Sequence, residues 1–336
     1  MAGAGGLPRR AGLTSGRMVD AAAAGRGTPA GVLAIDAGQS GMKVRVRSGL
    51  GSHDQLYDGI RTHEPLLSQL AQVARTAMAR SGVTPDVLTA GVSGLTEKDA
   101  DAAVLLRLVR DAGIRSVVLA HDSTTSFLGA LGDGRGAVVA SGTGVVTLAV
   151  GRDAIARVDG WGHIMGDAGS GYWIGREALD AVMRAYDRRG PQTALTDVVR
   201  GRWPDLAQAY IALQAAADRV SVVASFAEPV ARLAADGDEV ALRITHGAAR
   251  ELALSVSTSL ERVAHADDHG FTVCAMGGVF RSRRLYDAFI AEMGDRVAGA
   301  AVSVAPPLGE GIDGAIALAE LDQRHPLAAV VSTAQG

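Results

Sequence analysis

Two glycine turns, each between apolar strands, contain the residue types that hold phosphate groups. The first is Asp36-Ala37-Gly38-Gln39-Ser40-Gly41-Met42-Lys43, where glycine and serine expose backbone N–H groups that can bind phosphate oxygens. Lys43 could add a positive charge, and Asp36 at the strand end could hold a hydrated Mg²⁺, which prefers carboxylate, water and phosphate oxygens. A plain hairpin turn, with Lys43 on the solvent face of the sheet, is the alternative interpretation.

The second turn is Ser141-Gly142-Thr143-Gly144. Alone it is a weak signal, because glycine-rich hairpins are common. It occupies the same place in the second half of the chain as the first turn does in the first half. Two such turns facing each other would clamp a polyphosphate, so the pair predicts a nucleotide site. A third glycine pair, Gly277-Gly278, begins a predicted helix and leaves room for a flat ring or a sugar phosphate.

Asp122 directly follows the apolar strand Ser116–Ala120 and precedes a predicted helix. A carboxylate at the C-terminal end of a strand, in a cleft, could accept the proton of an attacking hydroxyl. An aspartate before Ser-Thr-Thr is equally suited to cap the N-terminus of that helix, so the residues alone leave both interpretations open. His121 is expected to be a neighbour of this site rather than a catalyst.

The segment Gly160–Gly175 is too rich in glycine for a regular element and holds two of the three tryptophans of the chain, which favours a binding loop. Glycine lets the backbone approach a ligand closely, and Asp167 among the glycines can accept hydrogen bonds from sugar hydroxyls. His163 is interpreted as a packed histidine. Cys274, inside an apolar strand, is interpreted as a buried and inert thiol.

The elements that must position these residues form two halves with one plan. Each half has a hairpin with a glycine turn, a third strand, and then alternating helices and strands, which predicts a duplicated α/β architecture with mixed sheets. In the first half we expect strands at Gly31–Asp36, Lys43–Arg47, Val87–Val92 and Ser116–Ala120, and helices at His63–Ser81, Glu97–Ala112 and Ser123–Leu131. In the second we expect strands at Gly136–Ala140, Val145–Val150, Ala154–Arg157, Phe271–Ala275 and Ala301–Ala305, and helices within Tyr172–Ala264 and at Arg281–Met293 and Ile312–Leu321.

Composition excludes several classes of protein. The chain of 336 residues suggests two domains, and 48% hydrophobic residues with 21% charged residues are ordinary for a globular protein. A net charge of −3 argues against a nucleic-acid partner, and one cysteine excludes a disulfide framework and an iron–sulfur cluster held by the chain. No apolar run is long enough to span a membrane, and no secretory signal is apparent, so we expect a cytoplasmic protein.

Taken together, these segments resemble the BadF/BadG/BcrA/BcrD-type ATPases of the sugar kinase, heat-shock chaperone and actin superfamily. Within that group the chain looks most like N-acetylglucosamine kinases and bacterial glucosamine kinases, over about Gly31 to Leu321. The most specific element is Asp159–Arg176 (DGWGHIMGDAGSGYWIGR), which is similar to the amino-sugar kinase signature. Pro307–Leu318 (PLGEGIDGAIAL) resembles the closing turn and helix of the family.

The resemblance implies two duplicated RNase H-like (actin-like ATPase) domains with a nucleotide and sugar cleft between them. The expected domains are 31–122 and 123–325, the second with a helical insertion, and we expect the closing helix 312–321 to pack on the first domain. Residues 1–30 and 326–336 are expected to be tails, with Met18 as an alternative start. A homodimer is a further possibility that relatives suggest.

The same resemblance assigns roles to single residues. Asp122 would be the catalytic base, and Asp36 would hold Mg²⁺ through water. The implied ATP and phosphate ligands are Gly38, Gln39, Ser40, Lys43, Gly142, Thr143, Gly144, Gly277 and Gly278. The implied sugar-binding residues are Asp122, Gly160, Trp161, Gly162 and Asp167.

Three departures from the family pattern bear on the identity of the sugar. The chain contains no asparagine, whereas animal N-acetylglucosamine kinases place one against the sugar. Val145 stands where those enzymes carry a serine, and Ala168 stands where a glutamate is usual. The expected reaction is therefore phosphoryl transfer from ATP to the 6-hydroxyl of an amino sugar, with N-acetylglucosamine as the first candidate and glucosamine as the alternative. A non-catalytic ATP-binding sugar sensor is a third interpretation.

Overall fold

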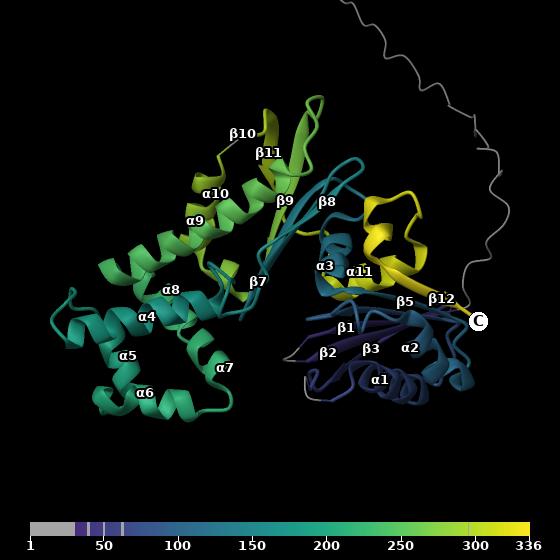
Figure 1. The fold of residues 1–336 in the computed structure, drawn as a ribbon, viewed down its shortest axis with the longest axis horizontal. Coiled ribbons are helices and arrows are strands. Elements are labelled where there is room, and N and C mark those ends of the chain that lie inside the picture. Colours follow the sequence, from purple (N-terminus) through teal and green to yellow (C-terminus); the bar gives the residue numbers. More distant parts are fainter. Residues whose placement is uncertain (1–30, 39–40, 50, 62–63, 295) are drawn as a thin grey trace, which may run out of the picture.

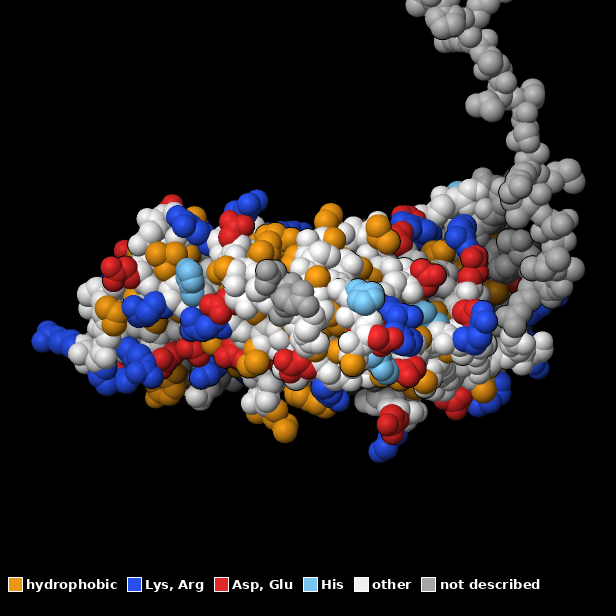
Figure 2. Space-filling view, turned by 90° about the horizontal axis from the view of Figure 1, so that it is seen from above, with side chains coloured by type: hydrophobic (Ala, Val, Ile, Leu, Met, Phe, Trp, Pro, Cys, Tyr) orange, Lys and Arg blue, Asp and Glu red, His pale blue; other side chains and the backbone are white. Residues whose placement is uncertain are grey.

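A computed structural model describes residues 31–38, 41–49, 51–61, 64–294 and 296–336 of the chain. Two of the predicted phosphate ligands, Gln39 and Ser40, and the predicted tail 1–30 lie outside the described residues. No helix in the described ranges is both long enough and apolar enough to cross a membrane. On the face seen in Figure 2, basic and acidic side chains are interspersed.

The described strands form two mixed six-stranded sheets (Figure 1). The first has the strand order β12-β5-β4-β1-β2-β3 and the second has the order β10-β11-β9-β6-β7-β8. The strands of the first sheet are β1 (Gly31–Ala37), β2 (Met42–Ser48), β3 (Gly51–Tyr57), β4 (Val87–Val92), β5 (Ser116–His121) and β12 (Ser332–Gln335). Those of the second are β6 (Gly136–Ser141), β7 (Val145–Val150), β8 (Ile155–Val158), β9 (Gly270–Met276), β10 (Arg296–Val297) and β11 (Ala300–Val304).

The two sheets have the same topology, which confirms the predicted duplicated α/β architecture. In the first, β1 pairs antiparallel with β2 and parallel with β4, and β4 pairs parallel with β5. In the second, β6 pairs antiparallel with β7 and parallel with β9, and β9 pairs parallel with β11. Each sheet ends on an antiparallel edge strand, β12 or β10. Because both central hairpins turn at glycines, the turns after β1 and after β6 are equivalent positions of the two halves.

Helices cover the sheets in distinct layers. The first sheet packs α1 (Leu66–Ser81) and α2 (Ala102–Val109) against one face, with Leu33, Ile35 and Leu88 in the core between them. The second sheet packs against the long α9 (Glu239–Glu261) and α10 (Arg283–Met293). A helical insertion between β8 and β9 adds α4 (Gly171–Tyr186), α5 (Leu195–Arg202), α6 (Leu206–Ala215), α7 (Arg219–Ala224) and α8 (Ala227–Ala235).

Two helices lie between the sheets, α3 (Asp122–Leu131) and α11 (Gly311–Ala317) (Figure 1). Their backbones touch, because a Cβ atom on Gly129 would lie 2.0 Å from the carbonyl oxygen of Glu310. A Cβ on Gly314 would lie 1.8 Å from the carbonyl oxygen of Thr125. The helix α11 also packs on β1 through Ile312, Ala315 and Ile316. This close crossing brings the ends of β1 and β5 next to the segment that precedes α11.

Apart from shifts of a few residues at the ends of other helices and strands, the structure differs from the sequence predictions at three elements. Helix α2 begins at Ala102 rather than at residue 97, because the Asp101 side chain accepts from the N–H of Val104 and caps it. Strand β3 is exposed and polar, so it carries no apolar pattern that could have predicted it. Residues 326–336, expected to be a tail, form a short 3₁₀ helix (Pro326–Val330) and β12, because backbone groups of β5 are available for pairing at the sheet edge.

Candidate active site

An acidic cluster lies where β1 ends. Asp36 is the last but one residue of β1, and the strand register places it opposite Lys43. Nζ of Lys43 lies 2.6 Å from Oε2 of Glu310, just before α11. Burial, together with the nearby carboxylates of Asp122 and Glu310, raises the pKa of Asp36 to about 6 against the opposing effect of Lys43. Three carboxylates therefore share one described ammonium group, an excess of negative charge that suits a cation.

Asp122 is the first residue of α3, and the N-cap of that helix is His121. The capping role that the sequence left open for Asp122 therefore belongs to its neighbour, whose Nδ1 accepts from the N–H of Ser123 at 3.2 Å. Burial raises the pKa of Asp122, but His121, the Ser93 hydroxyl and the N–H of Ser123 together hold it below its usual range. Asp122 is thus an ionised carboxylate at neutral pH.

One oxygen of Asp122 is poorly satisfied. Oδ1 is buried without a hydrogen-bond partner of good geometry in the described part of the chain. Nδ1 of His121 lies 2.8 Å away, but this nitrogen is directed at the N–H and the hydroxyl of Ser123, so it is not a well-directed donor to Asp122. A buried carboxylate oxygen with a free lone pair is able to accept a proton from a hydroxyl group placed beside it.

The glycine segments of the second half share one cavity. It has a volume of about 690 Å³ and is lined by Gly142, Thr143 and Gly278 among others. Gly277 has a φ of 98°, and a Cβ there would lie 2.2 Å from the carbonyl oxygen of Ser141, so only glycine fits. The first turn of α4 fixes the Ser141–Gly144 turn, because the N–H of Tyr172 donates to the carbonyl oxygen of Thr143 at 3.0 Å. The Thr143 side chain is exposed to the cavity.

Another part of the lining of this cavity comes from the helical insertion, which the sequence analysis did not assign to a site. It carries the charged residues Glu228 and Arg232 on α8, and Arg281 follows from the segment before α10. Among the described ion pairs, none involves these three side chains. The sequence held no signal for them, because charged residues four apart on a helix usually mark a solvent-exposed face.

The glycine-rich loop is ordered by two aspartates that both have positive φ, Asp159 at 60° and Asp167 at 58°. The carboxylate of Asp159 accepts from the N–H groups of Gly160, Asp167 and Ala168 at 2.8, 2.8 and 3.0 Å. Asp167 is buried and accepts from the N–H of Gly162 at 3.2 Å. Burial and the nearby Asp159 raise the pKa of Asp167. Part of the hydrogen-bonding capacity of Asp167 therefore serves the loop itself.

The structure groups the predicted site residues into neighbouring sets. Asp167 lies against the second phosphate turn, because a Cβ on Gly144 would be 2.7 Å from Oδ2 of Asp167. Trp161 stands out from the loop with 67% of its surface exposed. No hydrogen bond or ion pair between described residues joins this loop to Asp36 or Asp122. Gly38 lies at the first turn, where its N–H donates to the carbonyl of Gly41 at 3.0 Å.

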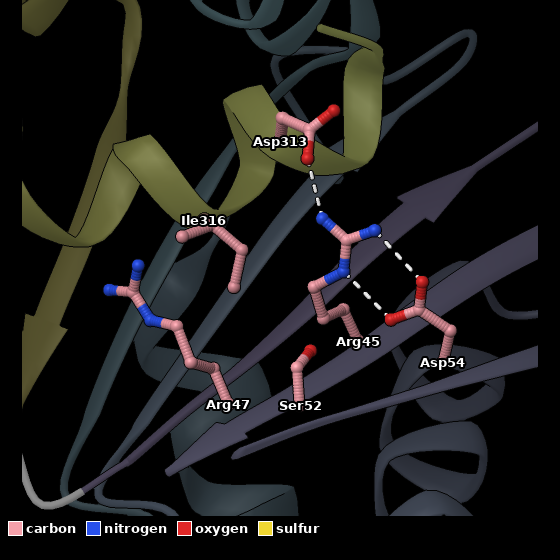
Figure 3. A pocket seen from close by; sticks show the side chains of 6 residues that line it. All are labelled: Arg45, Arg47, Ser52, Asp54, Asp313 and Ile316. Carbon is pink, nitrogen blue, oxygen red and sulfur yellow. Dashed lines mark hydrogen bonds and ion pairs between the residues drawn. The ribbon is translucent and has the colours of Figure 1, made fainter. Parts of the chain in front are cut away.

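A second cavity of about 600 Å³ contains none of the predicted ligands (Figure 3). Arg45 on β2 lies between Asp54 on β3 and Asp313 on α11, with Nε 2.7 Å from Oδ1 of Asp54. Nη2 of Arg47 lies 3.2 Å from Oε1 of Glu320. With Lys43 and Glu310, these pairs tie β2 to the segment around α11. The cavity is therefore bordered by charges that are already paired.

The residues near β1 can be tested as a magnesium site. No group of three or more His, Cys, Asp or Glu side chains is placed to hold a metal ion within the described ranges. A magnesium ion bound by one carboxylate, water and phosphate oxygens does not need such a group. The excess negative charge around Asp36 and its raised pKa fit an ion held in that way.

Comparison with known proteins places the chain among ATPases. It is 28% identical over 211 residues to an N-acetylmuramic acid/N-acetylglucosamine kinase of Clostridium acetobutylicum, a match that covers 59% of this chain and 66% of that relative. It is 45% identical over 65 residues to an N-acetyl-D-glucosamine kinase of Dictyostelium discoideum, covering 19% of this chain and 20% of the relative. The chain thus spans less than two thirds of the length of either curated relative.

A solved structure of a proposed N-acetylglucosamine kinase from Chromobacterium violaceum superposes with a TM-score of 0.64. It is 22% identical, and the match covers 86% of this chain and 98% of that one, so the likeness shows the actin-like ATPase fold. The model of the BadF/BadG/BcrA/BcrD ATPase family matches residues 33–319. The chain belongs to the BadF/BadG/BcrA/BcrD ATPase family.

Proposed function

We propose that the chain is an ATP-dependent sugar kinase that transfers the γ-phosphoryl group of ATP to the 6-hydroxyl of an amino sugar. The observation that carries the proposal is the 690 Å³ cavity, in which the two glycine segments with nucleotide-binding character line one space. The relatives in Clostridium and Dictyostelium, whose names state amino-sugar kinase activities, support the class of acceptor.

In this proposal the cavity takes the nucleotide. The backbone around Gly142 and Thr143 binds the phosphates, and the Thr143 hydroxyl adds a donor. The Glu228 carboxylate is suited to accept hydrogen bonds from the ribose hydroxyls. The guanidinium planes of Arg232 and Arg281 are suited to stack on the adenine ring. Gly278 lines the cavity with open space at its Cβ position, which leaves room for the adenosine.

Asp122 acts as the general base. The oxygen of the acceptor hydroxyl bonds to the γ-phosphorus as the bond to the β-phosphate oxygen breaks, and ADP leaves. The proton of that hydroxyl passes to the carboxylate of Asp122, whose Oδ1 has no well-directed partner. The low pKa of Asp122 keeps the carboxylate ionised for this role. Asp36 would hold Mg²⁺ through water, and that ion supplies charge neutralisation on the phosphates when it is bound.

The acceptor lies, in this proposal, against the loop that contains Gly160, Trp161, Gly162 and Asp167. N-acetylglucosamine is the first candidate and glucosamine is the alternative. The absence of asparagine from the chain and Ala168 in place of the usual acidic residue leave the contacts to the acetamido group different from those of the animal enzymes.

The test is ADP release from ATP and Mg²⁺ with N-acetylglucosamine, glucosamine, N-acetylmannosamine and glucose offered separately. We expect at least one amino sugar to stimulate release and the product to carry phosphate on O6. The variant Asp122→Asn should lose turnover, whereas Asp101→Asn, at a remote helix cap where asparagine serves equally well, should keep it. ADP release that no sugar stimulates would contradict the proposal.

A further inference from the structure

The guanidinium of Arg157 is held beside the loop that the proposed function gives to the acceptor. Arg157 lies on β8, the edge strand of the second sheet. Its Nη2 donates to the carbonyl oxygen of Gly160 at 2.8 Å, and its Cζ lies 5.7 Å from the ring centroid of Trp161. The side chain is thus held by one hydrogen bond and one cation–π contact, both to proposed sugar-binding residues.

The charge of Arg157 is not neutralised by the protein around it. Arg152, in the β7–β8 hairpin connection, pairs with Asp267 at 2.9 Å, but none of the ion pairs in the described part of the chain involves Arg157. The nearest acid along the sequence, Asp159, uses both carboxylate oxygens for backbone N–H groups. A guanidinium has five N–H donors, and the Gly160 carbonyl takes one of them. Donors therefore remain for a ligand.

Apolar side chains stand beside this cation. Trp161, Ile164 and Met165 are 67%, 86% and 85% exposed, and such a group of large apolar side chains within one short loop is typical of a binding surface. A neutral sugar would leave the guanidinium without an anion. A sugar substituent that carries a carboxylate on a short apolar stem would match both the cation and the apolar rim, because guanidinium groups bind carboxylates in a fixed and often bidentate geometry.

We propose that Arg157 is a specificity-determining residue that lets the acceptor site take, besides uncharged N-acetyl sugars, amino sugars bearing a carboxylate on a ring substituent. The inference rests on the proposed function, since it assigns the acceptor class of the same site. It concerns Arg157 and its loop, and it adds no step to the phosphoryl transfer: the carboxylate stays ionised and only orients the sugar.

The test compares two acceptors that differ in one charge. N-acetylmuramic acid carries a lactyl carboxylate on O3 and a free 6-hydroxyl, and its methyl ester has nearly the same shape without the charge. We expect kcat/KM for the free acid to exceed that for the ester by about tenfold or more. This ratio should fall to within about threefold in Arg157→Gln and should shrink as salt is raised. Arg283→Gln, which breaks an exposed helix pair on α10, is the matched control and should keep the ratio.

The outcomes separate the two proposals. Arg157→Gln will also lower kcat/KM for every acceptor, because Arg157 holds Gly160 and Trp161, so the ratio of acid to ester is the readout. Turnover of N-acetylglucosamine with equal use of the acid and the ester would overturn the role of Arg157 and leave the kinase proposal standing. An unchanged ratio in Arg157→Gln would do the same. Failure of all acceptors would overturn the kinase proposal itself.

Discussion

Replacing Asp36 by asparagine should make the protein more stable at neutral pH while removing its function. The carboxyl group has a pKa of about 6 in the folded protein, mainly because of burial, against an ordinary value of 3.8. A raised carboxyl pKa means that the folded state holds the proton more tightly than the unfolded chain. The free energy of unfolding of the natural protein therefore falls as pH rises through the window from about 4 to 6, and Asp36→Asn escapes that loss.

The size of the effect follows from the shift of about two pKa units. At about 1.4 kcal/mol per unit, Asp36→Asn should gain up to about 3 kcal/mol at pH 7.5 relative to the natural chain. The gain should fall to about 0.5 kcal/mol at pH 4 and vanish below about pH 3, where the carboxyl group is protonated in both states. Asparagine is nearly isosteric, so packing against Gly311, whose Cβ position lies 2.7 Å from Oδ2 of Asp36, is preserved.

The assay is urea unfolding followed by circular dichroism at steps from pH 4 to 8, without nucleotide or metal. Asp54→Asn is the control of opposite sign, because its hydrogen bonds with Arg45 lower the pKa of Asp54 and its replacement should destabilise the protein at neutral pH. Added ATP and Mg²⁺ should stabilise the natural chain more than Asp36→Asn. A stability difference that is independent of pH, or a variant less stable than the natural chain at pH 7.5, would refute the reasoning.

Three further outcomes are expected. Asp122→Asn should lower kcat by about 10²–10⁴-fold while ADP affinity, measured by calorimetry, changes less than about threefold; equal losses in both would assign Asp122 to binding. Gly277→Ala should lose about 3 kcal/mol of unfolding free energy in the urea assay, because its Cβ would lie 2.2 Å from the Ser141 carbonyl oxygen. Gly278→Ala, which has open space at its Cβ, should lose less than about 1 kcal/mol in the same assay. Glu310→Gln removes one charge that raises the pKa of Asp36, so the acid limb of the rate profile should move to lower pH; a shift to higher pH would count against the cluster.

The framework of the fold was predictable because its signals are local. Apolar runs that end at glycine turns mark β1 and β6, and the hairpin register then places Lys43 opposite Asp36. The repeated order of strands and helices indicates two equivalent sheets before any contact is known. The predicted start of α3, Ser123, lies one residue from the observed start, although the side chain that caps this helix is that of His121 and not that of Asp122.

The remaining features depend on contacts between distant segments, which no short pattern encodes. Lys43 pairs with Glu310, 267 residues away in the sequence. The alternation of apolar and polar residues along β2 could therefore not show whether the Lys43 ammonium group is available to a phosphate. The cavity wall of Glu228 and Arg232 looks in sequence like any charged helix face, and only the fold of the insertion turns it toward the glycine segments. Strand β12 is short and weakly apolar, and it exists because β5 leaves an edge to pair with.

The first sheet and the helices that cover it come from two stretches of chain that the ribosome synthesises at different times. The sheet takes β1 to β5 from residues 31–121, but the face containing Val32 and Ala34 is covered by α11, and the edge of β5 is paired by β12. At about 5–20 residues per second, a ribosome needs about 10–40 s to add the residues between β5 and α11. During that interval the first sheet, which lacks only β12, exposes an apolar face and an unpaired edge, and both features promote aggregation. Nascent chains of this protein should therefore depend on chaperones until α11 emerges, and a truncation before residue 311 should destroy the sheet at the opposite end of the sequence.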